Sequence, residues 1–178
     1  MVRFFLFFVL IITASAQKPL SKAHAHNDYK NKRPLLDALE HGFCSVEADV
    51  YLVEGELLVG HDPEDLKAGR TLRKLYLDPL RKRIKLNRNQ VYGGDQMEFT
   101  LLIDIKSDGD ATYRALSKLL REYHEIFTGT KDGVTTKRAV TAVISGNRAK
   151  ETIVADNPRF AGIDGRLKDL DSDLDKHL

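Results

Sequence analysis

The order in which strand-like and helix-like segments alternate constrains the fold of this chain most. Runs with the two-residue period of a half-buried strand are predicted at 43–52, 100–107, 139–145 and 160–164, and a first short strand is predicted to end near His26. Helices are predicted between them, at 33–42, at 110–127 with Asp110 as N-cap, and from an N-cap at Asn147 to before Pro158. Such alternation is typical of a parallel sheet with right-handed crossovers. We therefore predict an α/β fold with about five parallel strands.

Three acidic side chains are predicted to share one face of the sheet. Apolar and polar residues alternate in the run 43–52, so Glu47 and Asp49 project to the same side, and Asp104 lies late in the run 100–107. Carboxylates that converge in a partly dry site repel one another unless protons or a cation neutralise them. With the amide oxygen of Asn27 as a fourth ligand, this set suits a hard divalent cation, Ca²⁺ or Mg²⁺, better than zinc.

Two histidines and a lysine are the candidates for proton transfer and phosphate binding. His26 directly precedes Asn27, and His61 follows the apolar run 57–60 at a predicted strand end. Imidazole titrates near neutral pH, so two histidines beside a bound cation can take a proton from a nucleophile and give one to a leaving group. Lys106 lies two residues after Asp104 on the same face, where it is placed to steady a phosphate oxygen.

Four short blocks follow one another along the chain. They are HND at 26–28, EAD at 47–49, HD at 61–62 and IDIK at 103–106. In this order and spacing they resemble the superfamily of phospholipase C-like phosphodiesterases, whose members fold as TIM barrels. The nearest branches are the glycerophosphodiester phosphodiesterases and the relatives of the fungal proteins named for altered inheritance of mitochondria. The resemblance extends from Ala23 to Ile163.

The resemblance implies metal-dependent cleavage of a phosphodiester, with His26 and His61 as the acid–base pair. It implies four metal ligands, Asn27, Glu47, Asp49 and Asp104. Asp104 stands where many relatives carry a glutamate, and with Lys106 it is similar to the DLK block of spider-venom sphingomyelinase D. The opening HND, where ordinary glycerophosphodiesterases have HRG, leaves open whether the substrate is a glycerophosphodiester or a phospholipid. In relatives the substrate's own hydroxyl is often the attacking group, which gives a cyclic phosphate first.

The length of the chain does not match a whole barrel. A (β/α)₈ barrel typically needs about 250 residues, whereas this chain has 178 residues. We therefore expect a partial TIM barrel, the first half to two thirds of such a domain, which this chain does not close. Open strand edges expose unpaired backbone groups, so self-association through these edges is also expected.

The N-terminus has the layout of a secretory signal peptide, with a positive charge, an apolar run at 4–12 and a small-residue ending at 14–16. We predict cleavage after residue 16, which leaves 17–178 as one phosphodiesterase-like domain of an exported protein, periplasmic or secreted. Cys44 is the single cysteine, so no intrachain disulfide forms. Because Cys44 lies in an apolar run, we expect a small buried side chain rather than a reactive thiol.

One alternative is a secreted binding module or an inactive fragment that binds anionic groups. The stretch 67–88 holds nine Lys and Arg residues against one acid, Asp78, and such a stretch suits anionic glycans or lipid headgroups. The plainer interpretation of the same stretch is a solvated loop and helix face whose leucines turn inward, at Leu72, Leu75, Leu77 and Leu80.

A second alternative is a zinc-dependent phosphoesterase or amidohydrolase, in which an H-x-H pair such as His24 and His26 ends the first strand. Such sites need further histidines on later strands, whereas His124 falls in a predicted helix and His177 lies at the tail. In the phosphodiesterase interpretation His24 has a structural role. The partners expected are a phosphodiester substrate and, through lipid headgroups, a membrane surface, but no nucleic acid.

Overall fold

The computed structural model describes residues 18–94 and 97–169. They form a six-stranded sheet with a path of five strands in the order β1-β2-β4-β7-β8. The strands of this path pair in parallel and are β1 (Leu20–Ala25), β2 (Phe43–Val53), β4 (Phe99–Ile105), β7 (Val140–Gly146) and β8 (Ala161–Ile163). Outside the path, β3 (Glu56–Val59) pairs antiparallel with β2.

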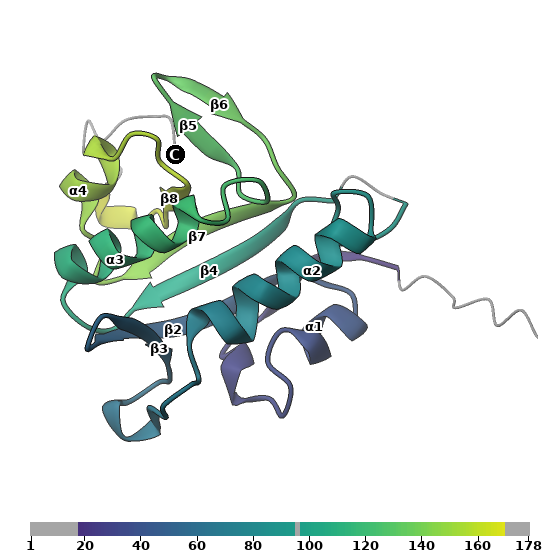
Figure 1. Ribbon diagram of the computed structural model, residues 1–178, viewed down its shortest axis with the longest axis horizontal. Coiled ribbons are helices and arrows are strands. Elements are labelled where there is room, and N and C mark those ends of the chain that lie inside the picture. The colour runs from purple at the N-terminus through teal and green to yellow at the C-terminus, as the bar shows by residue number, and fades with distance from the viewer. Residues whose placement is uncertain (1–17, 95–96, 170–178) are drawn as a thin grey trace, which may run out of the picture.

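Helices connect the parallel strands and cover the sheet. The α-helices are α1 (Leu36–Glu40), α2 (Asp78–Leu86), α3 (Gly109–Arg121) and α4 (Lys150–Ala155). The short helical turns are η1 (Asp28–Lys30), η2 (Pro63–Asp65), the π-helical η3 (Arg73–Leu77) and η4 (Leu167–Asp169). A separate two-stranded hairpin consists of β5 (Gly129–Lys131) and β6 (Val134–Thr136). Figure 1 shows α2 and α3 lying over one face of the sheet, with the β5–β6 hairpin projecting beside β7.

The two faces of the sheet differ in burial. In β4, the side chains of Phe99, Leu101, Ile103 and Ile105 are buried, and they belong to the same core as Leu80 of α2 and Leu116 of α3. The alternate positions of β4, Thr100, Leu102 and Asp104, are only half-buried. The strand period therefore places the apolar side chains under the helices and leaves polar groups on the opposite face.

The predicted α/β fold with five parallel strands is confirmed. Among the described residues the sheet is open, with β1 and β8 at its edges, and closure into a TIM barrel stays a prediction. The predicted signal peptide, residues 1–16, lies outside the described residues. Within the basic stretch, Leu72, Leu77 and Leu80 are fully buried and Leu75 packs partly against the core, as the plainer interpretation expected.

The predicted helix boundaries were partly wrong. The side chain of Asp108, rather than Asp110, caps α3 by accepting a hydrogen bond from the backbone N–H of Ala111 at 2.8 Å. The helix then ends at Arg121, because the chain turns so that Tyr123, Ile126 and Phe127 reach the core. In this turn the backbone carbonyl of Ile126 accepts a hydrogen bond from the N–H of Val140.

The other two predicted helices are shorter than expected. The first includes only five residues, because Leu35 has a φ of 63° and its N–H donates to the Asp28 carboxylate instead of starting a helix. The third begins at Lys150, and Asn147 is not its N-cap. The Asn147 amide donates to the backbone carbonyl of Ser107 at 2.8 Å, which joins the ends of β4 and β7.

Two hairpins were not predicted as such. The turn of the β5–β6 hairpin is Asp132-Gly133, with φ values of 50° and 77°. An Asp-Gly pair with positive φ at both residues is a strong local signal for a two-residue hairpin turn. The turn between β2 and β3, Glu54-Gly55, has the same signs of φ, at 49° and 84°.

Candidate active site

Three carboxylates meet near the carboxyl end of the parallel pairing between β2 and β4. Glu47 and Asp49 project from β2, and the parallel register sets Asp49 opposite Asp104 of β4. One ligand atom from each of the three residues lies within 4.8 Å of the others. Glu47 and Asp49 are buried, at 7% and 0% exposure. The structure therefore brings together the three acids that the sequence singled out.

The two oxygens of Asp49 have different surroundings. Its Oδ2 accepts from the Tyr29 hydroxyl at 2.7 Å and lies 2.9 Å from Nδ1 of His61 and 3.2 Å from Nζ of Lys106. Its Oδ1 is buried and has no hydrogen-bond partner. A buried carboxylate oxygen without a donor is costly, so Oδ1 fits a cation ligand better than a purely structural role.

Asn27 lies beside these carboxylates because of its backbone conformation. With a φ of 52°, Asn27 lies between β1 and η1 in the left-handed region, which asparagine tolerates better than most residues. Its backbone N–H donates to Oε2 of Glu47 at 2.8 Å, and its side-chain Oδ1 accepts from the Tyr29 hydroxyl at 2.6 Å. The amide oxygen predicted as a fourth ligand is thus close to the acid cluster.

The two predicted proton-transfer histidines contact different carboxylates. Nε2 of His26 lies 3.3 Å from Oε2 of Glu47, and Nδ1 of His61 lies 2.9 Å from Oδ2 of Asp49. Their side chains are 72% and 42% exposed, respectively. The imidazoles therefore flank the acid cluster and remain accessible from solvent.

Lys106 is the cation of the cluster. Its Nζ lies 3.1 Å from Oδ1 of Asp104 and 3.2 Å from Oδ2 of Asp49. Burial alone would lower the pKa of Lys106, but the hydrogen bonds to Asp104 and Asp49 raise it above its ordinary value. Three carboxylates and one ammonium leave a formal charge of −2, which a divalent cation would neutralise.

Three residues that the sequence analysis left without a role support the site. Asp28 is fully buried and accepts from the N–H of Leu35 and the hydroxyl of Tyr76, which fixes the turn after His26. Burial raises the pKa of Asp28.

Tyr29 places its hydroxyl among the predicted ligands, and burial and Asp49 raise the pKa of Tyr29. Gly146 of β7 packs directly against Asp104. The sequence carried a signal for Asp28 and Tyr29, because Asp28 is part of the block HND and Tyr29 follows that block directly.

His24 does not join this cluster. Its Nδ1 lies 2.7 Å from the hydroxyl oxygen of Ser45, which precedes Glu47 by two residues on β2. Among the described residues, the one group of three or more His, Cys, Asp and Glu side chains close enough to hold a metal ion is the acid cluster, with no histidine in it. In this part of the chain, the H-x-H pair of the zinc alternative therefore belongs to no group of three such side chains.

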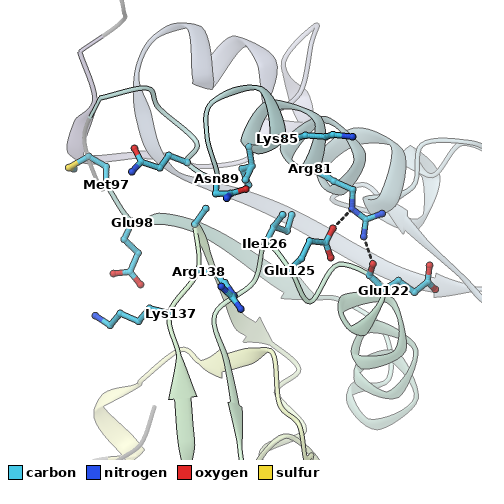
Figure 2. A pocket seen from close by; sticks show the side chains of 13 residues that line it. Arg81, Lys85, Asn89, Met97, Glu98, Glu122, Glu125, Ile126, Lys137 and Arg138 are labelled. Atoms are coloured by element: carbon cyan, nitrogen blue, oxygen red, sulfur yellow. Dashed lines mark hydrogen bonds and ion pairs between the residues drawn. The ribbon is translucent and has the colours of Figure 1, made fainter.

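The arginines of the basic stretch bind within the chain. Arg73 and Arg81 form ion pairs of 2.7 Å with Glu122 and Glu125, and Nε of Arg83 donates to the backbone carbonyl of Val91 at 2.6 Å. Figure 2 shows Arg81 reaching Glu125 and the backbone of Glu122 at one side of a cavity of about 1050 Å³. This cavity is lined by side chains of both charges near the amino ends of β4 and β7, away from the acid cluster.

The fold and the site define the class of protein. It is an α/β protein whose candidate site lies where parallel strands end, as is usual for open parallel sheets. The chain belongs to the family of the AIM6-like phosphodiesterase domain, whose model matches residues 14–160. This agrees with the resemblance to phospholipase C-like phosphodiesterases, without deciding the branch within that superfamily.

The curated relatives are fungal. The chain is 34% identical over 176 residues to altered inheritance of mitochondria protein 6 of Eremothecium gossypii, covering 86% of this chain and 44% of the relative. It is 41% identical over 112 residues to the protein of the same name from Lachancea thermotolerans, covering 55% and 26%. The homolog from Arthroderma benhamiae is 30% identical over 168 residues, covering 83% and 54%.

The chain spans about half the length of the relatives from Eremothecium gossypii and Arthroderma benhamiae. No solved structure gave a significant match to it. In the part of the chain that the structure describes, no helix has both the length and the apolar character needed to cross a membrane.

Proposed function

We propose that the acid cluster is the centre of a metal-dependent phosphodiesterase that acts on glycerophosphodiester or phospholipid-type substrates. The observation that carries the proposal is the bare, buried Oδ1 of Asp49 in a cluster of formal charge −2. The family supplies the reaction class, phosphodiester cleavage. Ca²⁺ or Mg²⁺ fits the donor set, because all of its ligand atoms are oxygens.

Four residues would hold the cation: Asn27, Glu47, Asp49 and Asp104. When bound, the cation would supply charge neutralisation at the phosphoryl oxygens and lower the pKa of a neighbouring hydroxyl or water. Lys106 carries three N–H donors, of which two are used on Asp104 and Asp49. The third is left for a phosphate oxygen of the substrate.

The two histidines exchange protons with the attacking and the leaving oxygen. A carboxylate only accepts hydrogen bonds, so the proton between His61 and Asp49 sits on Nδ1 of His61. Nε2 of a neutral His61 then keeps its lone pair, which makes this ring the proton acceptor. His26, which contacts Glu47 instead of Asp49, is the proton donor to the leaving oxygen.

Hydrolysis followed by ³¹P NMR tests the proposal on the full chain. Glycerophosphocholine and phosphatidylcholine vesicles would be offered separately, with EDTA and then with Ca²⁺, Mg²⁺ or Zn²⁺. We expect cleavage that EDTA abolishes and that Ca²⁺ or Mg²⁺ restores. A cyclic phosphate signal would identify the substrate's own hydroxyl as attacker. Equal rates with EDTA and with cation, or cleavage of neither substrate, would contradict the proposal.

Two further parts of the proposal concern the surroundings of the site. We infer that residues 1–16 direct export, and N-terminal sequencing of the protein from the extracellular or periplasmic fraction should start at Gln17. We also infer self-association through the edges at β1 and β8, because among the described residues each edge strand has one unpaired side. Size-exclusion chromatography with light scattering should show species larger than the monomer. A sharp monomer peak would count against the second inference.

A further inference from the structure

Tyr29 is held rigidly at both ends. Its ring is 4% exposed and belongs to the hydrophobic core. Its backbone carbonyl accepts a hydrogen bond of 2.8 Å from Nη2 of Arg70. Its hydroxyl emerges from the core into the acid cluster. A tyrosine anchored in this way presents its hydroxyl at a fixed point, with little conformational freedom left to lose.

The hydroxyl of Tyr29 touches three residues of the candidate site. It lies 2.6 Å from Oδ1 of Asn27, 2.7 Å from Oδ2 of Asp49 and 3.1 Å from Nδ1 of His61. A phenol has one proton to donate and lone pairs with which to accept. The two oxygens are both acceptors, so they share the one phenol proton, and the N–H of His61 is the donor toward the phenol oxygen.

These contacts act both on the cation ligand Asp49 and on the proton acceptor His61. On Asp49, the hydroxyl shares Oδ2 with His61 and Lys106, which holds the carboxylate so that Oδ1 stays without a donor. On His61, both neighbours of Nδ1, the phenol oxygen and Oδ2, can accept its proton, which fixes the ring as the Nδ1–H tautomer.

We propose that Tyr29 is a positioning residue that couples the cation site to His61: one hydroxyl orients the ligand oxygens of Asn27 and Asp49 and fixes the orientation of the His61 ring. The inference rests on the proposed function. It is asymmetric, because the hydroxyl contacts His61 and not His26, whose partner is Glu47. Tyr29 itself touches no reacting atom.

The test compares Tyr29→Phe with a matched control, Tyr113→Phe, in the full chain. Tyr113 is 1% exposed and its hydroxyl donates to Oδ2 of Asp156 at 2.9 Å, so the control also removes a buried phenol–carboxylate bond, but away from the site. Two readouts other than activity are used: calorimetric titration with Ca²⁺ and Mg²⁺, and ¹⁵N NMR of the histidine rings in EDTA at pH 8.

The expected results are specific to Tyr29. Groups that orient metal ligands typically contribute 10- to 100-fold in affinity, so Tyr29→Phe should bind the cation about 10- to 100-fold more weakly, and Tyr113→Phe should bind as the wild type does. His61 should be the Nδ1–H tautomer in all three proteins, because Asp49 accepts that proton. The Nδ1 signal of His61 should shift in Tyr29→Phe alone, because the ring loses its contact with the phenol oxygen. The ring of His26 should not change.

Failure of the inference is distinguishable from failure of the proposed function. If Tyr29→Phe kept wild-type cation affinity and an unchanged ¹⁵N spectrum of His61, the role of Tyr29 would be refuted while the metal site stood. If the wild type bound neither cation, the proposed function would fail and the coupling with it. Should Tyr29→Phe not fold, the wild-type spectrum still decides, because an Nε2–H tautomer of His61 would overturn the inference.

Discussion

A Cβ atom added to Gly146 would collide with the carboxylate of Asp104 and with the backbone of Ile105. The two strand ends approach so closely because Gly146 pairs with Ile105 in the parallel register of β4 and β7. Gly146 also has a φ of 70°, a conformation that residues with a side chain rarely adopt. The position of Asp104, and with it one side of the acid cluster, thus depends on the absence of a side chain on the neighbouring strand.

Gly146→Ala should destabilise the fold and disturb the site together. The matched control is Gly133→Ala in the β5–β6 hairpin, where φ is 77° but nothing lies within 4 Å of an added Cβ. The control has only the backbone strain of about 1–2 kcal/mol, whereas Gly146→Ala adds overpacking of about 1–3 kcal/mol. Urea unfolding measures the difference, and cation titration should show weaker binding for Gly146→Ala alone. Equal losses of stability would contradict the close contact with Asp104.

Cation binding should raise the melting temperature of the chain, because a ligand that binds only the folded state stabilises it by mass action. At a concentration 100 times the Kd, the gain is about 2.7 kcal/mol. Thermal unfolding in EDTA, then in Ca²⁺ or Mg²⁺, measures the shift. Asp104→Asn should abolish it, while Asp156→Asn, which changes a carboxylate bound to Tyr113 and Arg121 outside the cluster, should retain it. An unchanged shift in Asp104→Asn would remove Asp104 from the ligand set.

Loss of either flanking histidine should lower activity with little effect on folding. General acid–base groups contribute about 10²- to 10⁴-fold to rate, so His26→Ala and His61→Ala should each lower kcat by a factor in this range. Both rings are well exposed, so their melting temperatures should stay close to that of the wild type. His124→Ala is the control, since this side chain is 68% exposed and lies outside the site. Wild-type rates in both variants would show that neither ring takes part in the reaction.

Cys44 should be inert toward thiol reagents in the folded protein. It is 4% exposed, and burial raises the pKa of its thiol above the ordinary value. Only the thiolate reacts, so at pH 8 the folded protein holds less of the reactive form than the unfolded chain, whose thiol pKa is about 8.5. Labelling with a disulfide reagent should be at least about tenfold slower than in urea, and the folded protein should catch up only as the pH rises. Equal rates with and without urea would mean that the thiol is accessible.

The strands and their polar faces could be predicted because the signal is local. Glu47, Asp49 and Asp104 alternate with buried apolar residues, so their common side follows from the strand period alone. Helix ends were predicted less well, because competing contacts decide them. Asp108 and Asp110 both suit an N-cap, and the choice of Asp108 follows from the backbone position that places its side chain against Ala111.

The sequence by itself determined the alternation of about five parallel strands with helices and the set of residue types for the site, because hydrophobic period and motif spacing can be recognised along the chain. Only the tertiary structure decided which atoms meet. The hydroxyl of Tyr29 meets Asp49 of another element, and Gly146 approaches Asp104 across two strands. The packing of these elements also leaves Oδ1 of Asp49 buried without a donor. Such contacts depend on register and packing between distant segments, and no local pattern in the chain encodes their distances.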